Sequence, residues 1–210
     1  MKQIIEPYHG KYESVLLFGP PGVGKGTLGK FLASGGGQYH LSSGEIFRRL
    51  AGYTPAGKLF YSYAKKGELV PDEETISIWK HYVDGLIATN VYYPHSQYLL
   101  LDGIPRTLQQ AKLIDQFISV RHVIVLESSN TDSLVERLEW RARCEGKVEE
   151  VAPSVIDRRL QAYEREIGAL LAFYPVHMVS RVNGEQKPLE VLRDVLVRLS
   201  HILSRPLPKG

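Results

Sequence analysis

The stretch "GPPGVGKGT", Gly19–Thr27, decides how the rest of the chain is expected to fold. It follows the apolar run "SVLLF" at 14–18 and precedes a segment with helical spacing. In that context a glycine-rich loop wraps around phosphate with its backbone N–H groups inward, and the N-terminus of the following helix adds a positive dipole. Lys25 supplies a mobile positive charge to the outer phosphates. The stretch therefore predicts a phosphate-binding loop between a buried strand and a helix.

One position of this loop differs from the common pattern, in which Ser or Thr follows the lysine and places a hydroxyl on Mg²⁺. Here Gly26 follows Lys25, and Thr27 comes one residue later. A nearby carboxylate is then needed, and Asp102 is the candidate because it ends the apolar run "QYLLLD" at 97–102. A neighbouring parallel strand would bring it beside the loop, where it would hold Mg²⁺ through water.

The distribution of apolar residues predicts an α/β fold. Short apolar runs bounded by turn residues are typical of buried parallel strands, and they lie at 14–18, 97–102, 122–127 and 176–182. Longer segments with helical periodicity separate them. In the last one, apolar residues recur three or four apart along one helical face, which we expect to pack on the core: Leu189, Leu192, Val195, Leu196, Leu199, Ile202 and Leu203. The alternation indicates a doubly wound parallel sheet with ligands beyond the carboxyl ends of its strands.

Composition excludes several classes of protein. The 210 residues are 43% hydrophobic and 23% charged, which suits one sizeable core. The net charge of +3 comes without a run of Lys or Arg, so we expect no nucleic-acid partner. No stretch approaches the roughly 20 apolar residues that cross a bilayer, and the single Cys144 cannot form an internal disulfide. We expect a cytoplasmic protein that does not bind membranes.

Four motifs together make the expectation specific. Between residues 19 and 111 the chain carries, in this order, "GPPGVGKGT", "LSSGEIFRRL", "KKGELVPDEE" and "LLDGIPRTLQQA". This set resembles the adenylate kinase family of nucleoside monophosphate kinases, in its short-lid form. The resemblance runs from Ser14 to the "VNGE" at 182–185. Lys-Gly-Thr is the family's own ending of the loop, so Gly26 is characteristic of it.

The resemblance implies both an architecture and a reaction. The fold would be a five-stranded parallel P-loop sheet flanked by helices, with a core formed by residues 1–42, 72–141 and 155–210. Residues 43–71 would form a helical monophosphate-binding insertion, and residues 142–154 a short lid. The enzyme would be an ATP:AMP phosphotransferase, a monomer that catalyses MgATP + AMP ⇌ 2 ADP by in-line transfer. Its ligands would be ATP, AMP, ADP and Mg²⁺.

The resemblance also implies roles for individual residues, because charge spread over phosphate oxygens is best met by positioned cations. The catalytic side chains would be Lys25, Arg48, Arg106, Arg137, Arg141 and Arg159. ATP would be bound by Gly22, Val23, Gly24, Lys25, Gly26, Thr27 and Arg137. AMP would be bound by Ser43, Gly44, Arg48, Leu69, Val70, Gly103, Arg106, Gln110 and Arg159. Asp102 would hold the metal through water.

The chain departs from the family pattern in the lid, where Val148 stands in place of an arginine. Lys147 and Arg143 are the candidates to replace it. Two alternatives stay open: a kinase of another monophosphate such as UMP or CMP and, because of the altered lid, a weakly active nucleotide-binding regulatory protein. Thr107 favours AMP, because relatives that act on UMP or CMP typically carry asparagine there.

Overall fold

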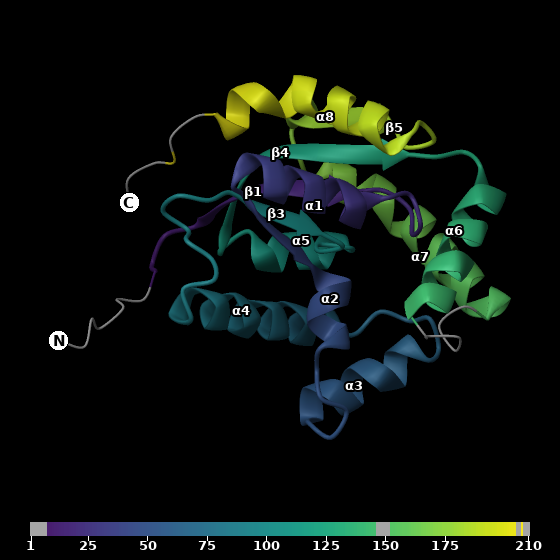
Figure 1. Cartoon of the computed structure of the whole chain (residues 1–210). Coiled ribbons are helices and arrows are strands. Elements are labelled where there is room, and N and C mark those ends of the chain that lie inside the picture. The colour runs from purple at the N-terminus through teal and green to yellow at the C-terminus, as the bar shows by residue number, and fades with distance from the viewer. Residues whose placement is uncertain (1–7, 146–151, 205–206, 208–210) are drawn as a thin grey trace.

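The computed structural model describes residues 8–145, 152–204 and 207, and they form a parallel five-stranded sheet between two layers of helices (Figure 1). The strand order is β2-β3-β1-β4-β5. The strands are β1 (Tyr12–Phe18), β2 (Tyr39–Ser42), β3 (Leu99–Asp102), β4 (Ile118–Glu127) and β5 (Val179–Asn183). The predicted doubly wound parallel sheet is confirmed.

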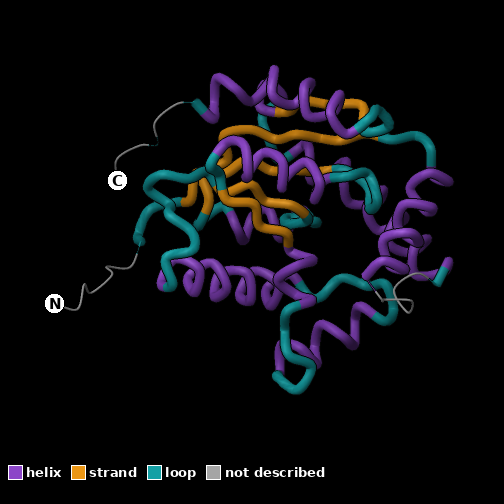
Figure 2. Tube along the Cα trace, viewed as in Figure 1, coloured by secondary structure: helices purple, strands orange, loops and turns teal. Residues whose placement is uncertain are grey.

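Helices connect the strands and cover both faces of the sheet (Figure 2). The α-helices are α1 (Lys25–Gly36), α2 (Ser43–Arg48), α3 (Pro55–Ala64), α4 (Asp72–Ala88), α5 (Leu108–Ile114), α6 (Thr131–Glu145), α7 (Pro153–Ala172) and α8 (Pro188–Leu203). A 3₁₀ turn, η2 (Val176–Met178), precedes β5. Among the described residues, none of the helices has the length and apolar character needed to span a membrane.

The central strands are apolar on both faces because two helical layers cover them. Along β1, Leu16 packs with Trp79 of α4 in one core cluster, while Leu17 packs with Leu32 of α1 and Val195 of α8 in the other. Alternate residues of a strand point to opposite faces, so a strand covered on both sides reads as one continuous apolar run. This is why β1, β3 and β4 were visible in the sequence.

The register of the sheet brings its functional ends together. Asp102 at the end of β3 pairs with Leu17 of β1 on one side and with Ser42 of β2 on the other. The phosphate-binding loop begins at Gly19, and α2 begins at Ser43. The glycine-rich loop, Asp102 and the N-terminus of α2 therefore meet at one edge of the sheet.

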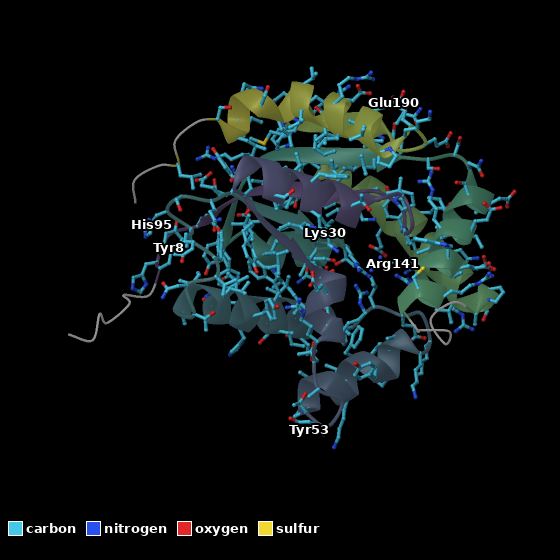
Figure 3. All side chains as sticks on the ribbon, in the orientation of Figure 1. Tyr8, Lys30, Tyr53, His95, Arg141 and Glu190 are labelled. Atoms are coloured by element: carbon cyan, nitrogen blue, oxygen red, sulfur yellow. The ribbon has the colours of Figure 1, made fainter. Side chains whose placement is uncertain are left out.

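Local sequence explains where several helices begin. The Thr54 hydroxyl accepts a hydrogen bond from Gly57 N at the start of α3, and the Thr107 hydroxyl accepts one from Gln110 N at the start of α5. The first turn of α4 carries Asp72 and two glutamates, which the helix dipole favours there. Helices α2 and α3 project from the sheet as an insertion with Tyr53 at its outer end (Figures 1 and 3).

Two expectations from the sequence were wrong in detail. Residues 176–178 form the turn η2 rather than the start of a strand, and Pro175 directly precedes it. In α8, Val191, Val195 and Leu199 are buried, and Leu192, Ile202 and Leu203 pack on the core while partly buried, whereas Leu189 and Leu196 are exposed. These two leucines lie seven residues apart, so they share a second helical face that points away from the sheet.

Strand β2 was not predicted as an apolar run. Its burial is partial, and only Leu41 of its four residues is fully buried. It lies at one end of the strand order, with β3 as its neighbour in the sheet. A short strand at the end of a sheet is only partly buried and needs fewer apolar residues. Its sequence therefore shows no clear apolar run.

The core predicts a clear contrast between two leucines. Leu101 is fully buried in β3, and Leu101→Ala should lower the free energy of unfolding by about 2–5 kcal/mol through lost contacts and a cavity. Leu189→Ala, at a position that is 70% exposed, should change it by no more than about 0.5 kcal/mol. Urea unfolding of both variants measures the difference. Equal losses would contradict the assignment of the core.

Candidate active site

A large cleft opens at the carboxyl edge of the sheet, with a volume of about 1330 Å³. Its walls come from the phosphate-binding loop, the insertion, the loop after β3, helices α6 and α7, and the loop between β5 and α8. Small-molecule pockets commonly have about 300–1,000 Å³, so this cleft can hold more than one ordinary ligand.

Most residues that the sequence singled out lie on the wall of this cleft. They are Gly22, Val23, Gly24, Lys25, Gly26, Thr27, Gly44, Arg48, Leu69, Asp102, Gly103, Arg106, Arg137, Arg141 and Arg159. Three others, Ser43, Val70 and Gln110, are buried behind the wall. The fold thus gathers side chains from positions 22 to 159 of the chain in one place.

The glycine-rich loop has the backbone that its sequence predicts. Gly22 has a φ of +85°, and a Cβ there would lie 2.7 Å from the carbonyl oxygen of Leu134 in α6. Only glycine combines that conformation with such close packing. Lys25 Nζ donates hydrogen bonds to the carbonyl oxygens of Gly19 at 2.7 Å and of Pro20 at 2.9 Å. The ammonium group is therefore held directly over the loop.

The surroundings of Lys25 lower the pKa of its ammonium group and so disfavour its charged form. Burial lowers the pKa of its ammonium group to about 8, with Arg106, Arg159 and Arg141 contributing in the same direction. The carboxylate of Asp102 opposes them. The influence of these groups on one lysine shows that they share its electrostatic environment. An anion in the cleft would relieve the repulsion among the cations.

Asp102 faces the position where the loop lacks a hydroxyl. A Cβ on Gly26 would lie 3.5 Å from Asp102 Oδ2, so the carboxylate stands next to the missing side chain. Burial opposes ionisation of Asp102, but His40 and Lys25 outweigh it and hold its pKa below the usual value. Asp102 is therefore an ionised carboxylate beside the phosphate-binding loop.

The loop after β3 is tied to the start of α2 through one carbonyl. Gly103 O accepts hydrogen bonds from Ser43 Oγ at 2.6 Å and from Arg106 Nε at 2.7 Å. Gly103 has a φ of +77°, and a Cβ there would lie 2.7 Å from Ser43 Oγ. This arrangement fixes the Arg106 side chain at the cleft. Ser43 acts on the cleft through this contact rather than by lining it.

Arg106 lines the cleft with part of its side chain exposed, and its Nε is bonded to Gly103 O. Burial lowers the pKa of its guanidinium to about 10, and Arg159 and Arg48 lower it further while Asp102 raises it. The group stays protonated at neutral pH, because that value lies well above 7. Its charge is nevertheless poorly compensated, and this favours an anionic ligand.

Helices α6 and α7 bring the remaining arginines. Arg137 and Arg141 are four residues apart on α6, so they lie on one helical face, and Arg159 comes from α7. Figure 3 shows Arg141 on the side of α6 that faces the middle of the molecule. Nearby, Arg158 Nη1 donates to the carbonyl oxygen of Lys66 at 3.0 Å, which connects α7 to the end of the insertion.

Gln110 is not directed freely into the cleft. Its Oε1 accepts a hydrogen bond from Arg106 N at 2.8 Å, and its Nε2 donates to Asp72 Oδ1 at 2.9 Å. Thr107 Oγ1 donates to the same carboxylate oxygen at 3.0 Å. Gln110 thus links the loop that carries Arg106 to the first residue of α4.

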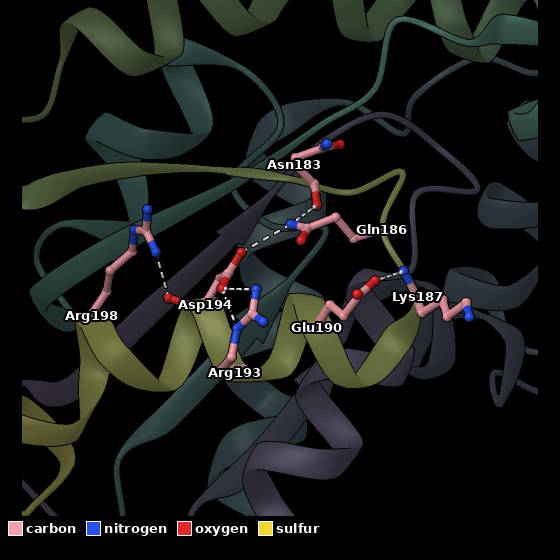
Figure 4. Close-up of polar contacts among 7 residues, drawn as sticks. All are labelled: Asn183, Gln186, Lys187, Glu190, Arg193, Asp194 and Arg198. Atoms are coloured by element: carbon pink, nitrogen blue, oxygen red, sulfur yellow. Dashed lines mark hydrogen bonds and ion pairs between the residues drawn. The ribbon is translucent and has the colours of Figure 1, made fainter.

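The loop between β5 and α8 also borders the cleft, through Gly184 and Gln186. Gln186 Nε2 donates to the carbonyl oxygen of Asn183 and to Asp194 Oδ2 (Figure 4). Glu185 Oε1 accepts four hydrogen bonds from residues 128–130. Both ends of this loop are therefore fixed, to α8 and to the start of α6.

Sequence reasoning missed several residues of the cleft wall, of which His40, Trp140, Tyr163 and Gln186 are the most distinctive. His40 could have been found, because it lies just before "LSSGE" near the end of a strand. The lid positions Lys147 and Val148 lie outside the described residues. Arg143 lines the cleft, and its Nη2 lies 3.4 Å from Glu139 Oε2.

The chemistry of this cleft suits a polyanion. Lys25, Lys30 and several arginines surround the buried carboxylate of Asp102, and the glycine-rich loop presents the N-terminus of α1. Guanidinium groups bind phosphate oxygens in pairs, and helix N-termini bind anions. The geometry indicates a site for phosphorylated ligands large enough for two of them.

Comparison with known proteins agrees with this geometry. The family model described as adenylate kinase matches residues 17–179. Proteins named adenylate kinase are similar over most of the chain. The one from Flavobacterium psychrophilum is 34% identical over 91% of this chain and 98% of its own length. The one from Flavobacterium johnsoniae is 36% identical over 77% and 84%, respectively, and the one from a Cyanothece strain is 34% identical over 91% and 95%. This chain belongs to the adenylate kinase family.

Proposed function

We propose that this chain transfers a phosphoryl group reversibly from MgATP to AMP, forming two ADP. Membership of the family makes it an ATP:AMP phosphotransferase, a nucleoside monophosphate kinase. The observation that carries the proposal is the arrangement around Lys25, where three arginines and Asp102 converge on a loop built for phosphate. Alternative substrates such as UMP or CMP are not favoured by the relatives that match this chain.

On the donor side, the amides of residues 22–27 and Lys25 would hold the phosphates of ATP, and Arg137 would add its guanidinium. The Lys25 ammonium already bonds two loop carbonyls, so its position over the loop is fixed before a ligand arrives. Such preorganised donors need little rearrangement during reaction, which is where most of the stabilisation of a charged transition state comes from.

On the acceptor side, Arg48 and Arg106 would bind the phosphate of AMP. Arg141 and Arg159 would stabilise the charge that spreads over the transferred group. The acceptor oxygen belongs to an already ionised phosphate, so no general base is required. Catalysis then consists of holding two phosphates in line and stabilising charge.

Mg²⁺ fits the residues that are present. The Asp102 carboxylate is an oxygen donor of the kind this ion prefers, and it stands beside Gly26, where other phosphate-binding loops supply a hydroxyl. We propose that Asp102 holds the ion through water. When bound, Mg²⁺ would neutralise charge on the donor phosphates and help to orient them.

The acceptor base would lie near Gly44, Leu69, Val70 and Gln110. Because the Gln110 amide already bonds Asp72 and Arg106 N, a contact with adenine requires it to exchange at least one of these bonds. The core, the insertion at 43–71 and the lid at 142–154 remain a proposed division, with movement of the last two excluding water from the cleft. The monomeric state and cytoplasmic location remain predictions.

The acceptor preference can be measured directly. A coupled assay with MgATP and, separately, AMP, CMP, UMP and GMP should give rapid ADP formation with AMP alone. Preference for a pyrimidine monophosphate would contradict the interpretation of Thr107 and Gln110. A folded protein that binds ATP but turns over none of the four would support the regulatory alternative.

Replacing one arginine should abolish most of the activity. Arg106→Ala should lower kcat/KM for AMP by about 100-fold or more, because a preorganised phosphate donor is lost. Arg165→Ala is the matched control, since Arg165 lies on α7, is largely exposed and pairs with Glu166. It should leave kcat/KM unchanged. Comparable losses in both variants would argue against the assigned role of Arg106.

The lowered pKa of Lys25 predicts a pH dependence of ATP binding. The ammonium is charged below about pH 8 and loses its charge above it, so affinity for ATP without Mg²⁺ should fall roughly tenfold between about pH 7.5 and about pH 9.5. Lys25→Arg keeps its charge over this range and should show weaker but pH-independent binding. Calorimetry measures both profiles, and a flat wild-type profile would refute the prediction.

A further inference from the structure

His40 has a buried side chain at the cleft, and the reaction described above assigns it no role. It lies on β2, where it pairs with Leu100 of β3, and Ser42 pairs with Asp102 two residues further on. His40 and Asp102 therefore project on the same face of the sheet. The His40 side chain is only 6% exposed, and its Nε2 lies 3.8 Å from Asp102 Oδ2.

The fold makes room for this imidazole at the expense of helix stability. A Cβ on Gly29, in α1, would overlap the His40 ring at Cδ2 and Nε2. Glycine inside a helix costs roughly 1 kcal/mol relative to alanine. At this position the lack of a side chain on Gly29 lets α1 and the imidazole of His40 pack together.

The polar edge of the ring is left without a bond. Within the residues that the structure describes, His40 Nε2 is buried and has no hydrogen-bond partner. Leaving a buried polar atom unsatisfied costs about 1–3 kcal/mol, so such atoms in a site usually serve a ligand or a neighbouring group. The nearest acidic group is Asp102, and His40 also lines the cleft.

We propose that His40 is a positioning residue for Asp102: its Nε2–H faces Oδ2 and orients the carboxylate for binding Mg²⁺ through water. This inference rests on the proposed function and deepens it at the metal. The carboxylate of Asp102 can accept a hydrogen bond from this N–H, because the two groups face each other across 3.8 Å and a small shift of either side chain brings them within bonding distance. Outer partners of metal-binding groups commonly fix ligand orientation, and their loss costs about 10–100-fold in metal affinity.

The test is the effect of Mg²⁺ on ATP affinity, measured by calorimetry in the absence of AMP. We expect His40→Leu to lower ATP affinity about 10-fold with Mg²⁺ and to leave it unchanged without Mg²⁺. His40→Gln keeps an N–H donor near the position of Nε2 and should retain most of the Mg²⁺ effect. Asp102→Asn should lose the effect, and adding His40→Leu to it should cost nothing more, because the two residues act through one interaction.

A matched control separates this role from packing. His122 is a buried histidine of β4, away from the cleft, whose Nε2 lies 2.9 Å from Ser180 Oγ. His122→Leu should lower thermal stability without changing the dependence of ATP affinity on Mg²⁺. If His40→Leu does not fold, His40→Asn offers the same comparison, because its amide cannot reach as far as Nε2.

Three results would overturn the inference. One is an equal loss of ATP affinity with and without Mg²⁺ in His40→Leu, which would mean that the imidazole only supports the loop. Another is additive losses in the double variant. The third is the absence of any Mg²⁺ effect in the wild type. By contrast, a wild type with a normal Mg²⁺ effect but no AMP-dependent ADP formation would refute the proposed function and leave the role of His40 intact.

Discussion

The parallel pairing of β1 with β3 is the constraint on which the site depends. It sets Asp102 level with Leu17, two residues before the glycine-rich loop begins at Gly19. A shift of one residue would move the side chain of Asp102 to the opposite face of the sheet. The alternating apolar residues of both strands fix the register, because each face must meet its own layer of helices. The packing of the core therefore also fixes the position of the Asp102 carboxylate at the cleft.

The second feature is a concentration of positive charge that the protein alone does not neutralise. Lys25 and Arg106 are both less basic than usual because burial and neighbouring cations disfavour their charged forms. Asp102 offsets only part of this repulsion. Uncompensated charges in such a site lower the stability of the free protein and favour binding of phosphate, because phosphate compensates them. The lowered pKa values of Lys25 and Arg106 therefore indicate a cleft that favours binding of a polyanion.

Hydrogen bonds and close contacts around the cleft join parts of the chain that are far apart in sequence. Gly103 O joins the start of α2 to the loop that carries Arg106. Arg158 of α7 donates a hydrogen bond to Lys66 at the end of the insertion. The next residue on this helix is Arg159. Gly67 packs against Val155 at the start of α7 with little room for a side chain. These contacts connect the end of the insertion to the helix that carries Arg159.

The sequence by itself determined the phosphate-binding loop and the parallel α/β class, and most of the residues that it singled out lie on the cleft wall. These signals are local: a glycine pattern between strand and helix, and apolar runs for strands such as β1 that are covered on both faces. It did not determine β2, whose burial is partial, or the division of α8 into a buried and an exposed apolar face. Only the tertiary structure placed His40 beside Asp102 and engaged the amide of Gln110 with Asp72. Both relations join residues separated by 62 and 38 positions, respectively, and depend on strand register and helix packing, which no single stretch of sequence encodes.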